Sequence, residues 1–243
     1  MTRPAGSELD VRALPPPERH RKIFELFDSL VENDSFVLVN DHDPRPIFHQ
    51  LRMERAGTVQ WVPISEGPEV WRIEIARLRP WEEEKEIAAA FGRDHDEIDL
   101  LLGYFRQDLQ SVRTDGKRPA GSLGGQFDEW DARLERHIRW EEEILFPEAE
   151  ALEPCLGQGP GRVMRMEHEE IRRLKTEVGR CVRTKDPAPA VLERASKALD
   201  SLVFVLTDHN HKEESIYYPM SERVLTGKKK EDLLRRVRGD RRP

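Results

Sequence analysis

The feature that most constrains this chain is a pattern that occurs twice. The segments 137–147 and 209–219 each begin with a His, carry a Glu four residues later followed by a second Glu, and end on a Pro ten residues after the His. The segments 94–98 and 167–171 also repeat each other, and each contains one His. His95 precedes His137 by 42 residues, and His168 precedes His209 by 41. The region from about 90 to 220 is therefore a duplicated unit of roughly 70 residues, and each copy supplies one His and one His-x-x-x-Glu.

Composition excludes several classes of protein. Of the 243 residues, 37% are hydrophobic and 36% are charged, which suits amphipathic helices with solvated outer faces. No run of 18 apolar residues exists, so we expect no transmembrane span, and the N-terminus lacks the apolar stretch of a signal peptide. The two cysteines are too few for a disulfide framework. We expect a cytoplasmic protein without membrane contact.

The charge is unevenly distributed along the chain. The net charge of −7 argues against general nucleic-acid binding. Residues 227–243 hold eight Lys or Arg against three acidic residues, so this segment carries +5 and the rest of the chain −12. We treat 227–243 as a basic C-terminal tail, which we expect to be a solvated helix or a disordered end.

Residues 1–79 are predicted to form a first, α+β domain. Short segments in which apolar and polar residues alternate indicate strands. Segments that begin with Pro and carry apolar residues at helical spacing indicate helices. The predicted strands are 9–12, 35–40, 58–63 and 69–75, and the predicted helices begin at Pro15 and span 47–55. The order β-α-β-α-β-β predicts a small two-layer sandwich.

Three segments of this domain, 9–12, 40–46 and 66–71, resemble an uncharacterised family with a fold like that of the sulfur-carrier protein TusA. The carriers place a Cys directly before a Pro-x-Pro at a helix start, where the helix N-terminus stabilises a thiolate. Asp43 stands at that position here, so the sulfur-transfer function is not carried over. His42, between two acidic residues, reads as a solvated turn residue or as a metal or substrate contact. In a sensing protein, this domain would read out the state of the second domain or contact a protein partner, and its sequence does not indicate which.

Residues 80–226 are predicted to form an all-α domain. Clusters of Pro, Gly and polar residues at 114–119, 154–161 and 184–189 divide this region into four long pieces. The pieces are apolar-periodic and nearly free of internal Pro. Short connections make neighbouring helices antiparallel, so the sequence predicts an up-down four-helix bundle.

Each long piece carries one apolar stripe, with apolar residues at alternating spacings of four and three. After the Glu of each repeated pattern, the stripes of the second and fourth pieces continue to Ile144 and Ile216, while Phe146 and Tyr217 are expected to pack in the core. Histidine and glutamate occupy the stripes at His95, His137, Glu141, His168, His209 and Glu213.

A lone His in a core is usually a hydrogen-bonded structural residue, and a buried unpaired carboxylate costs several kcal/mol. Six such groups at matching depth on four helices are better explained by metal ligation. The i, i+4 spacing of His-x-x-x-Glu places both side chains on one helix face. Asp94 and Glu167 each precede one of these histidines and are candidates for orienting a ring from outside. Glu142 and Glu214 each follow one of the glutamates and either hydrogen-bond to the site or are solvated. His211 is expected on the surface.

The repeated His-x-x-x-Glu-Glu pattern resembles the hemerythrin-like family, also called the HHE cation-binding domain, over about 90–222. The resemblance implies two non-haem iron ions bridged by carboxylates and by an oxo or hydroxo group. Carried over position by position, it assigns His95 and His137 to one iron, His168 and His209 to the other, and Glu141 and Glu213 to the bridge. A mixed imidazole–carboxylate set by itself suits iron, zinc or manganese.

The oxygen-carrying members have a further His one turn after the third-helix His, where this chain has Arg172. This departure argues against simple reversible oxygen carriage and leaves positions on the ions for water, dioxygen, peroxide or nitric oxide. Three hypotheses follow. The protein binds or senses dioxygen, nitric oxide or iron, it decomposes peroxide as an enzyme, or it is an interaction module with a structural metal.

Overall fold

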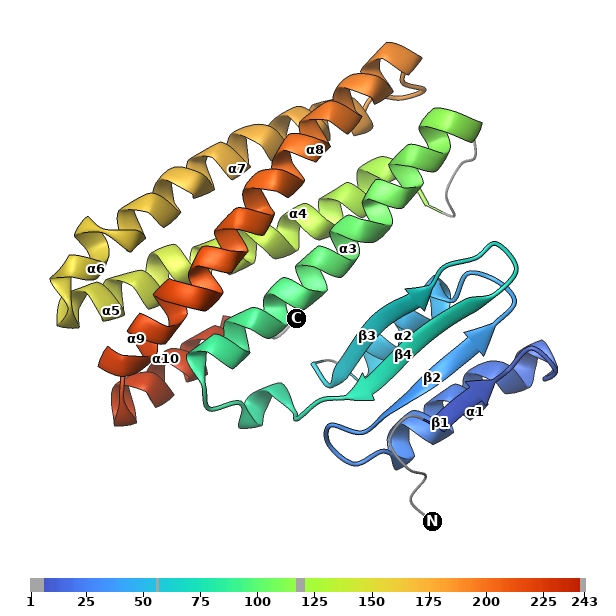
Figure 1. Cartoon of the computed structure of the whole chain (residues 1–243), viewed down its shortest axis with the longest axis horizontal. Coiled ribbons are helices and arrows are strands. Elements are labelled where there is room, and N and C mark those ends of the chain that lie inside the picture. Colours follow the sequence, from blue (N-terminus) through green and yellow to red (C-terminus); the bar gives the residue numbers. More distant parts are fainter. Residues whose placement is uncertain (1–6, 56, 117–120, 241–243) are drawn as a thin grey trace. The chain divides into compact units, whose positions relative to one another are not determined.

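The computed structural model describes residues 7–55, 57–116 and 121–240 (Figure 1). The chain divides into two compact units, Met1–Glu84 and Lys85–Pro243. Residues 1–6, for which the sequence predicts no signal peptide, lie outside the described residues. The last three residues of the predicted basic tail and part of the predicted loop at 114–119 also lie outside them.

The first unit has the predicted order of elements. It consists of β1 (Ser7–Asp10), α1 (Pro16–Ser29), β2 (Ser35–Asn40), α2 (Arg45–Glu54), β3 (Val59–Ser65) and β4 (Trp71–Arg77). The strands form one sheet in the order β1-β2-β4-β3, in which only β1 and β2 are parallel. This confirms the α+β sandwich, because both helices pack against one sheet as the second layer.

Strand register explains how this sheet builds its core. Phe36 on β2 pairs with Ile75 on β4, which pairs with Trp61 on β3, so these three buried side chains share one face. The same face receives the buried side chains of α1 and α2, including Phe27 and Leu51. Pro16 is the first residue of α1 and Pro46 is the second residue of α2, where the missing N–H leaves no hydrogen bond unmade.

The second unit is the predicted four-helix bundle. Its long helices are α3 (Ile87–Asp115), α4 (Leu123–Trp140), α7 (Pro160–Val182) and α8 (Pro189–Lys212), preceded by the short 3-10 helix η1 (Trp81–Glu83) of the first unit. Each long helix packs against two of the others in the cyclic order α3, α4, α7, α8 (Figure 1). The all-α prediction is therefore confirmed.

Local sequence explains where the long helices begin and end. Gly116 ends α3 in the left-handed conformation, with φ of 64°, and Ser122 caps α4 by accepting a hydrogen bond from the Gly125 N–H. Pro160 and Pro189 are the first residues of α7 and α8. A short helix, α6 (Pro154–Gln158), occupies the predicted break before α7.

Two π-helices interrupt the bundle at equivalent places. α4 continues through η2 (Glu141–Leu145) into α5 (Phe146–Leu152), and α8 continues through η3 (Glu213–Tyr217) into α9 (Tyr218–Val224). Each π-helix is followed by a Pro that cannot donate to the carbonyl four residues before it. Within the first interruption, the N–H of Phe146 bonds to the carbonyl of Glu141, five residues earlier, which is the π-helical pattern.

The π-helices correct one prediction about the core. The wider turn shifts the helix register by one residue, so the apolar stripe does not continue to the expected isoleucines. Ile216 is 46% exposed and Ile144 is half-buried, whereas Tyr217 and Phe146 are fully buried as expected. The alternating spacing of four and three assumed an uninterrupted α-helix, and that assumption is wrong after each Glu.

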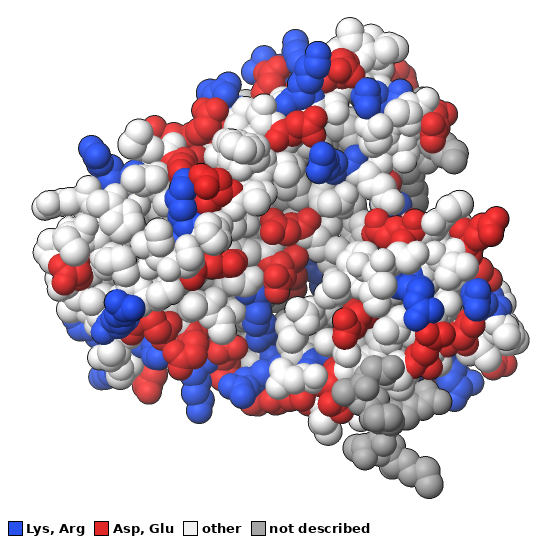
Figure 2. Space-filling model, in the orientation of Figure 1, with Lys and Arg blue, Asp and Glu red and all other residues white. Residues whose placement is uncertain are grey.

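The basic tail forms α10 (Gly227–Asp240), which packs against η2 and α3. It buries Leu233, Leu234 and Val237, and its Asp240 accepts a hydrogen bond of 2.7 Å from the indole N–H of Trp140. On the face shown in Figure 2, basic and acidic side chains are interspersed over the described residues. Among those residues, no helix combines the length and hydrophobicity needed to cross a bilayer.

Candidate metal centre

The bundle brings all six predicted ligand residues together in its interior. All six side chains are buried: His95 on α3, His137 on α4, Glu141 on η2, His168 on α7, His209 on α8 and Glu213 on η3. One donor atom from each of Glu141, His168, His209 and Glu213 lies within 4.8 Å of the others, and the same holds for His95, His137 and Glu213. The six groups thus form two overlapping clusters that share a carboxylate.

The histidines form two pairs whose Nε2 atoms face each other. These atoms are 2.9 Å apart in His95 and His137, and 3.0 Å apart in His168 and His209. When two imidazole nitrogens bind one ion through bonds of about 2.1 Å that form a right angle, the nitrogens lie about 3.0 Å apart. Each pair therefore fits one ion.

The two carboxylates each extend between the histidine pairs. Glu141 directs Oε1 towards His137 Nε2, at 3.6 Å, and Oε2 towards His168 Nε2, at 3.2 Å. Glu213 directs Oε2 towards His95 Nε2, at 3.3 Å, and Oε1 towards His209 Nε2, at 3.1 Å. Glu141 Oε2 and Glu213 Oε1 are buried and face imidazole Nε2 atoms, so protons on those rings or metal ions must compensate the carboxylate charges. This arrangement fits two ions joined by two carboxylates.

Four further carboxylates hold the imidazole rings from the other side. Each ring contacts one of them through Nδ1, in the pairs His95–Glu214 at 2.8 Å, His137–Asp94 at 3.1 Å, His168–Glu142 at 2.9 Å and His209–Glu167 at 3.0 Å. A carboxylate accepts, so each Nδ1 carries a proton, and each Nε2 faces the centre, where it can bind an ion once the ring is neutral. Asp94 and Glu167 therefore contact rings as expected, and of the two possibilities for Glu142 and Glu214 the structure has the hydrogen bond to the site.

Three of these outer carboxylates are themselves paired with a cation. Arg133 binds Asp94 at 2.7 Å, Arg172 binds Glu142 at 2.8 Å, and Lys212 binds Glu167. The fourth, Glu214, has a side chain that is 50% exposed. Arg172, which stands where oxygen carriers have a fifth His, thus faces Glu142 and not the centre.

The carboxylates dominate the acid–base properties of the centre. Burial lowers the pKa of His95, but its hydrogen bonds to Glu213 and Glu214 outweigh burial and raise the pKa to about 10. The pKa of His209 is raised to about 10 in the same way by Glu213 and Glu167. Burial raises the pKa of Glu141, but the charge of His137 holds it well below its usual range. Protons therefore balance the buried negative charge when no metal ion does so.

Tyr218 is the residue of the centre that the sequence analysis missed. Its hydroxyl donates to Glu141 Oε1 at 2.6 Å and lies 3.2 Å from Glu213 Oε2 and 3.3 Å from the Nε2 atoms of both His95 and His137. Burial and the nearby carboxylates raise the pKa of this phenol far above its usual value. The sequence did mark Tyr218 as equivalent to Phe146, because each is the fifth residue after the Glu of its repeat.

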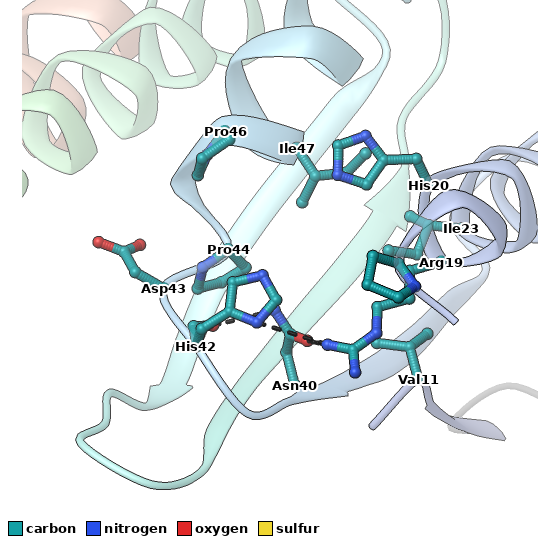
Figure 3. Close-up of a pocket in the computed structure, with 11 residues that line it drawn as sticks. Val11, Arg19, His20, Ile23, Asn40, His42, Asp43, Pro44, Pro46 and Ile47 are labelled. Carbon is teal, nitrogen blue, oxygen red and sulfur yellow. Dashed lines mark hydrogen bonds between the residues drawn. The ribbon is translucent and has the colours of Figure 1, made fainter. Parts of the chain in front are cut away.

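The first unit has a separate, small pocket of about 80 Å³ where β2 ends and α1 and α2 begin (Figure 3). Arg19, His20 and His42 line it together with Asp43, the residue at the sulfur carriers' Cys position. His42 contacts Asp41 through Nδ1, at 2.6 Å, and Asp41 also accepts two hydrogen bonds from Arg19. His42 is 62% exposed at its side chain, in agreement with a turn residue.

The bundle, with its buried His and Glu cluster, defines the class of hemerythrin-like, metal-binding four-helix proteins. Residues 85–221 match the model of the Hemerythrin HHE cation binding domain. Because this match covers more than half of the chain, the protein belongs to that family.

Residues 8–77 match the model of an uncharacterized conserved protein family, DUF2249. This match covers the α+β unit and leaves the TusA-like identity of that unit a prediction. No curated protein and no solved structure matches the chain.

Proposed function

We propose that the protein holds two non-haem iron ions and binds or senses a small ligand such as dioxygen or nitric oxide on them. His95 and His137 hold one ion, His168 and His209 hold the other, and Glu141 and Glu213 bridge them. The observation that carries this proposal is that each of these two carboxylates offers one oxygen to each histidine pair.

The donor set supports iron over softer metals. It consists of imidazole nitrogens and carboxylate oxygens, and neither of the free cysteines, Cys155 and Cys181, belongs to the clusters. Each ion receives two nitrogens and two bridging oxygens, fewer than the six ligands that iron commonly takes. The remaining positions are where a small ligand would bind, and iron supplies the redox chemistry for dioxygen.

The test is the metal content and optical spectrum of protein purified without oxygen and then exposed to air. We expect about two irons per chain and a new near-ultraviolet charge-transfer band after exposure. Zinc alone, or no metal in a protein whose helical content is unchanged, would overturn the proposal.

Peroxide decomposition is a second candidate, favoured by the symmetry of the ligand set. Arg172 stands where a fifth His would be, and it binds Glu142 and not the centre. Each proposed ion therefore has the same number of protein ligands. Turnover of peroxide by the iron-loaded protein, lost in Glu141→Ala, would support this function. Absence of turnover in iron-loaded protein would remove it.

A further inference from the structure

The helix α10 lies beyond the part of the chain that matches the HHE domain. The match ends at residue 221, whereas α10 begins at Gly227. The helix is nevertheless docked on the bundle, because it packs against η2 and α3 and buries Leu233, Leu234 and Val237. The family match therefore does not account for a helix that contacts one wall of the candidate centre.

The C-terminal end of α10 is fastened beside the bridging carboxylate Glu141. Trp140, the residue before Glu141, is buried, and its indole N–H donates to Asp240 of α10 at 2.7 Å. Arg139 binds the same Asp240 carboxylate at 2.5 Å. The Trp140 ring also lies beside the His137 ring, with centroids 6.4 Å apart. A shift of η2 or of the His137 ring would therefore disturb the docking of α10.

The second copy of the repeated pattern is held in another way. Lys212 stands at the position equivalent to Trp140, since each precedes the Glu of its pattern by one residue. Lys212 binds Asp208, one turn earlier on its own helix, at 2.5 Å, and it also binds Glu167 of α7. The residue before Glu213 is thus held from within the four-helix bundle, whereas the residue before Glu141 is held by α10.

The N-terminal end of α10 is fastened to the start of α3. Lys230 binds Glu222 at 2.7 Å and Glu86 at 3.0 Å. The other oxygen of Glu222 accepts a hydrogen bond of 2.7 Å from the N–H of Ile87, the first residue of α3, and so caps that helix. The first unit ends at Glu84 in the sequence, so this cap holds the first helical turn that follows the linker.

We infer that α10 couples the candidate metal centre to the start of α3, so that the occupied centre favours docked α10 and docked α10 strengthens metal binding. Glu141 has fewer positions open to it once its oxygens bind ions, so η2 offers α10 a more constant surface. Undocking of α10 releases Lys230 from Glu222 and loosens the first turn of α3. This inference rests on the proposed iron centre, and it adds the route by which occupancy of that centre reaches the linker.

The first test compares hydrogen exchange in the iron-loaded and the chelator-treated full chain. Coupling between two sites is commonly 5- to 150-fold, so exchange of the α10 amides should slow by about that factor on loading. The amides of Ile87 and Ala88, which both donate to Glu222, should slow with them. Lys230→Met should abolish the response at these two amides and leave that of α10 in place. Lys229→Met, at the exposed neighbouring position, is the matched control.

The second test measures iron affinity by competition with a chelator. Leu234→Asp places a charge on the buried face of α10 and should open the helix. Because coupling is reciprocal, the affinity for the two ions should fall by the factor by which iron slows exchange in α10. Asp240→Ala should have a smaller effect of the same sign, and Asp240→Asn should restore most of the affinity because its side-chain oxygen still accepts from Trp140. Arg235→Ala is the matched control, since Arg235 is exposed and pairs with Asp232 within α10.

Iron uptake by the unaltered protein with unchanged exchange in α10 would overturn the inference and leave the iron centre intact. A response at Ile87 that survives in Lys230→Met would overturn the route through α10. If Leu234→Asp loses the helical content of the bundle, Asp240→Ala decides alone, and an unchanged iron affinity in that variant counts against the inference. Unaltered protein that takes up no iron would refute the proposed function itself.

Discussion

The two halves of the bundle keep the same inner groups and differ in the residues that surround them. Each half supplies two histidines and one glutamate, a π-helix at the glutamate, and an acidic partner for each ring. Around the pair His95 and His137, the bundle has Gly92 and the half-exposed Glu214. Around the pair His168 and His209, it has Arg165 over the Phe146 ring. The two copies thus share the buried histidine and carboxylate groups and differ in the residues around them.

Geometry constrains the carboxylates of such a centre more strongly than the aromatic rings around it. A bridging carboxylate must reach both ions, so its helix position is fixed in both copies. A ring beyond the ligands has only to fill space, so Phe146 and Tyr218 can differ by one hydroxyl without a change of fold. Function can therefore differ between two copies at positions where packing tolerates it.

The largest expected effect is the loss of both ions when a bridge is removed. Glu141→Ala takes one oxygen away from each end, so iron content should fall at both ends from about two per chain towards zero. Metal analysis after desalting measures this. Glu143→Ala is the matched control, because Glu143 is exposed on the same π-helix and should leave iron content unchanged. Retention of one iron in Glu141→Ala would mean that the two ends are independent.

A large effect is also expected from pH in the metal-free protein. The pKa values of His95 and His209 are raised from 6.5 to about 10 by the buried carboxylates. A raised pKa contributes stability that is fully present below pH 6.5 and is lost as pH rises towards 10, by up to about 1.4 kcal/mol per pH unit for each proton.

Iron-loaded protein should not show this decline, because its imidazoles are already neutral and the ions balance the carboxylates. Urea unfolding of chelator-treated and iron-loaded protein between about pH 6.5 and 10 measures the difference. Equal declines in the two forms would mean that the metal does not replace these protons.

Much of this architecture follows from the sequence because helical periodicity and repetition report directly on what faces the core. The repeated His-x-x-x-Glu and the repeated single His together placed six polar groups on four apolar stripes, and all six are buried together. Asp94 and Glu142 each stand next to one of the six groups in the sequence, but each contacts a histidine of a neighbouring helix, so the partner of each could not be predicted from the sequence.

Two features could not be predicted in the same way. A π-helix forms when N–H groups bond to the carbonyl five residues earlier, and the spacing of apolar residues does not report that choice. The register shifts at Glu141 and Glu213 therefore could not be predicted from the spacing. Tyr218 was missed for the same reason, because a continuous α-helix does not turn it towards the histidines. The function of the α+β unit also stayed open, since Asp43 and its neighbours show no arrangement specific to one chemistry.

A smaller effect is expected from the outer carboxylates, and it should be unequal. Asp94 is buried and shared between His137 and Arg133, so Asp94→Asn should weaken iron binding by about 10- to 100-fold. Glu214→Gln should cost less, because water can replace a half-exposed carboxylate at His95. Competition with a chelator measures both affinities. Equal losses would show that burial of the outer carboxylate does not decide its contribution.

The smallest expected effect tests the register shift itself. Ile216 follows Glu213 by three residues, and an unbroken α-helix would bury it in the core, where Ile→Ala costs about 2–5 kcal/mol. Because η3 turns Ile216 outward, to 46% exposure, Ile216→Ala should change the free energy of unfolding by less than about 0.5 kcal/mol. Ile171→Ala, at a fully buried position of α7, is the control that should show the full cost. A loss of about 2 kcal/mol or more in Ile216→Ala would mean that the second copy lacks the π-helix in solution and that Tyr218 does not face His95 and His137.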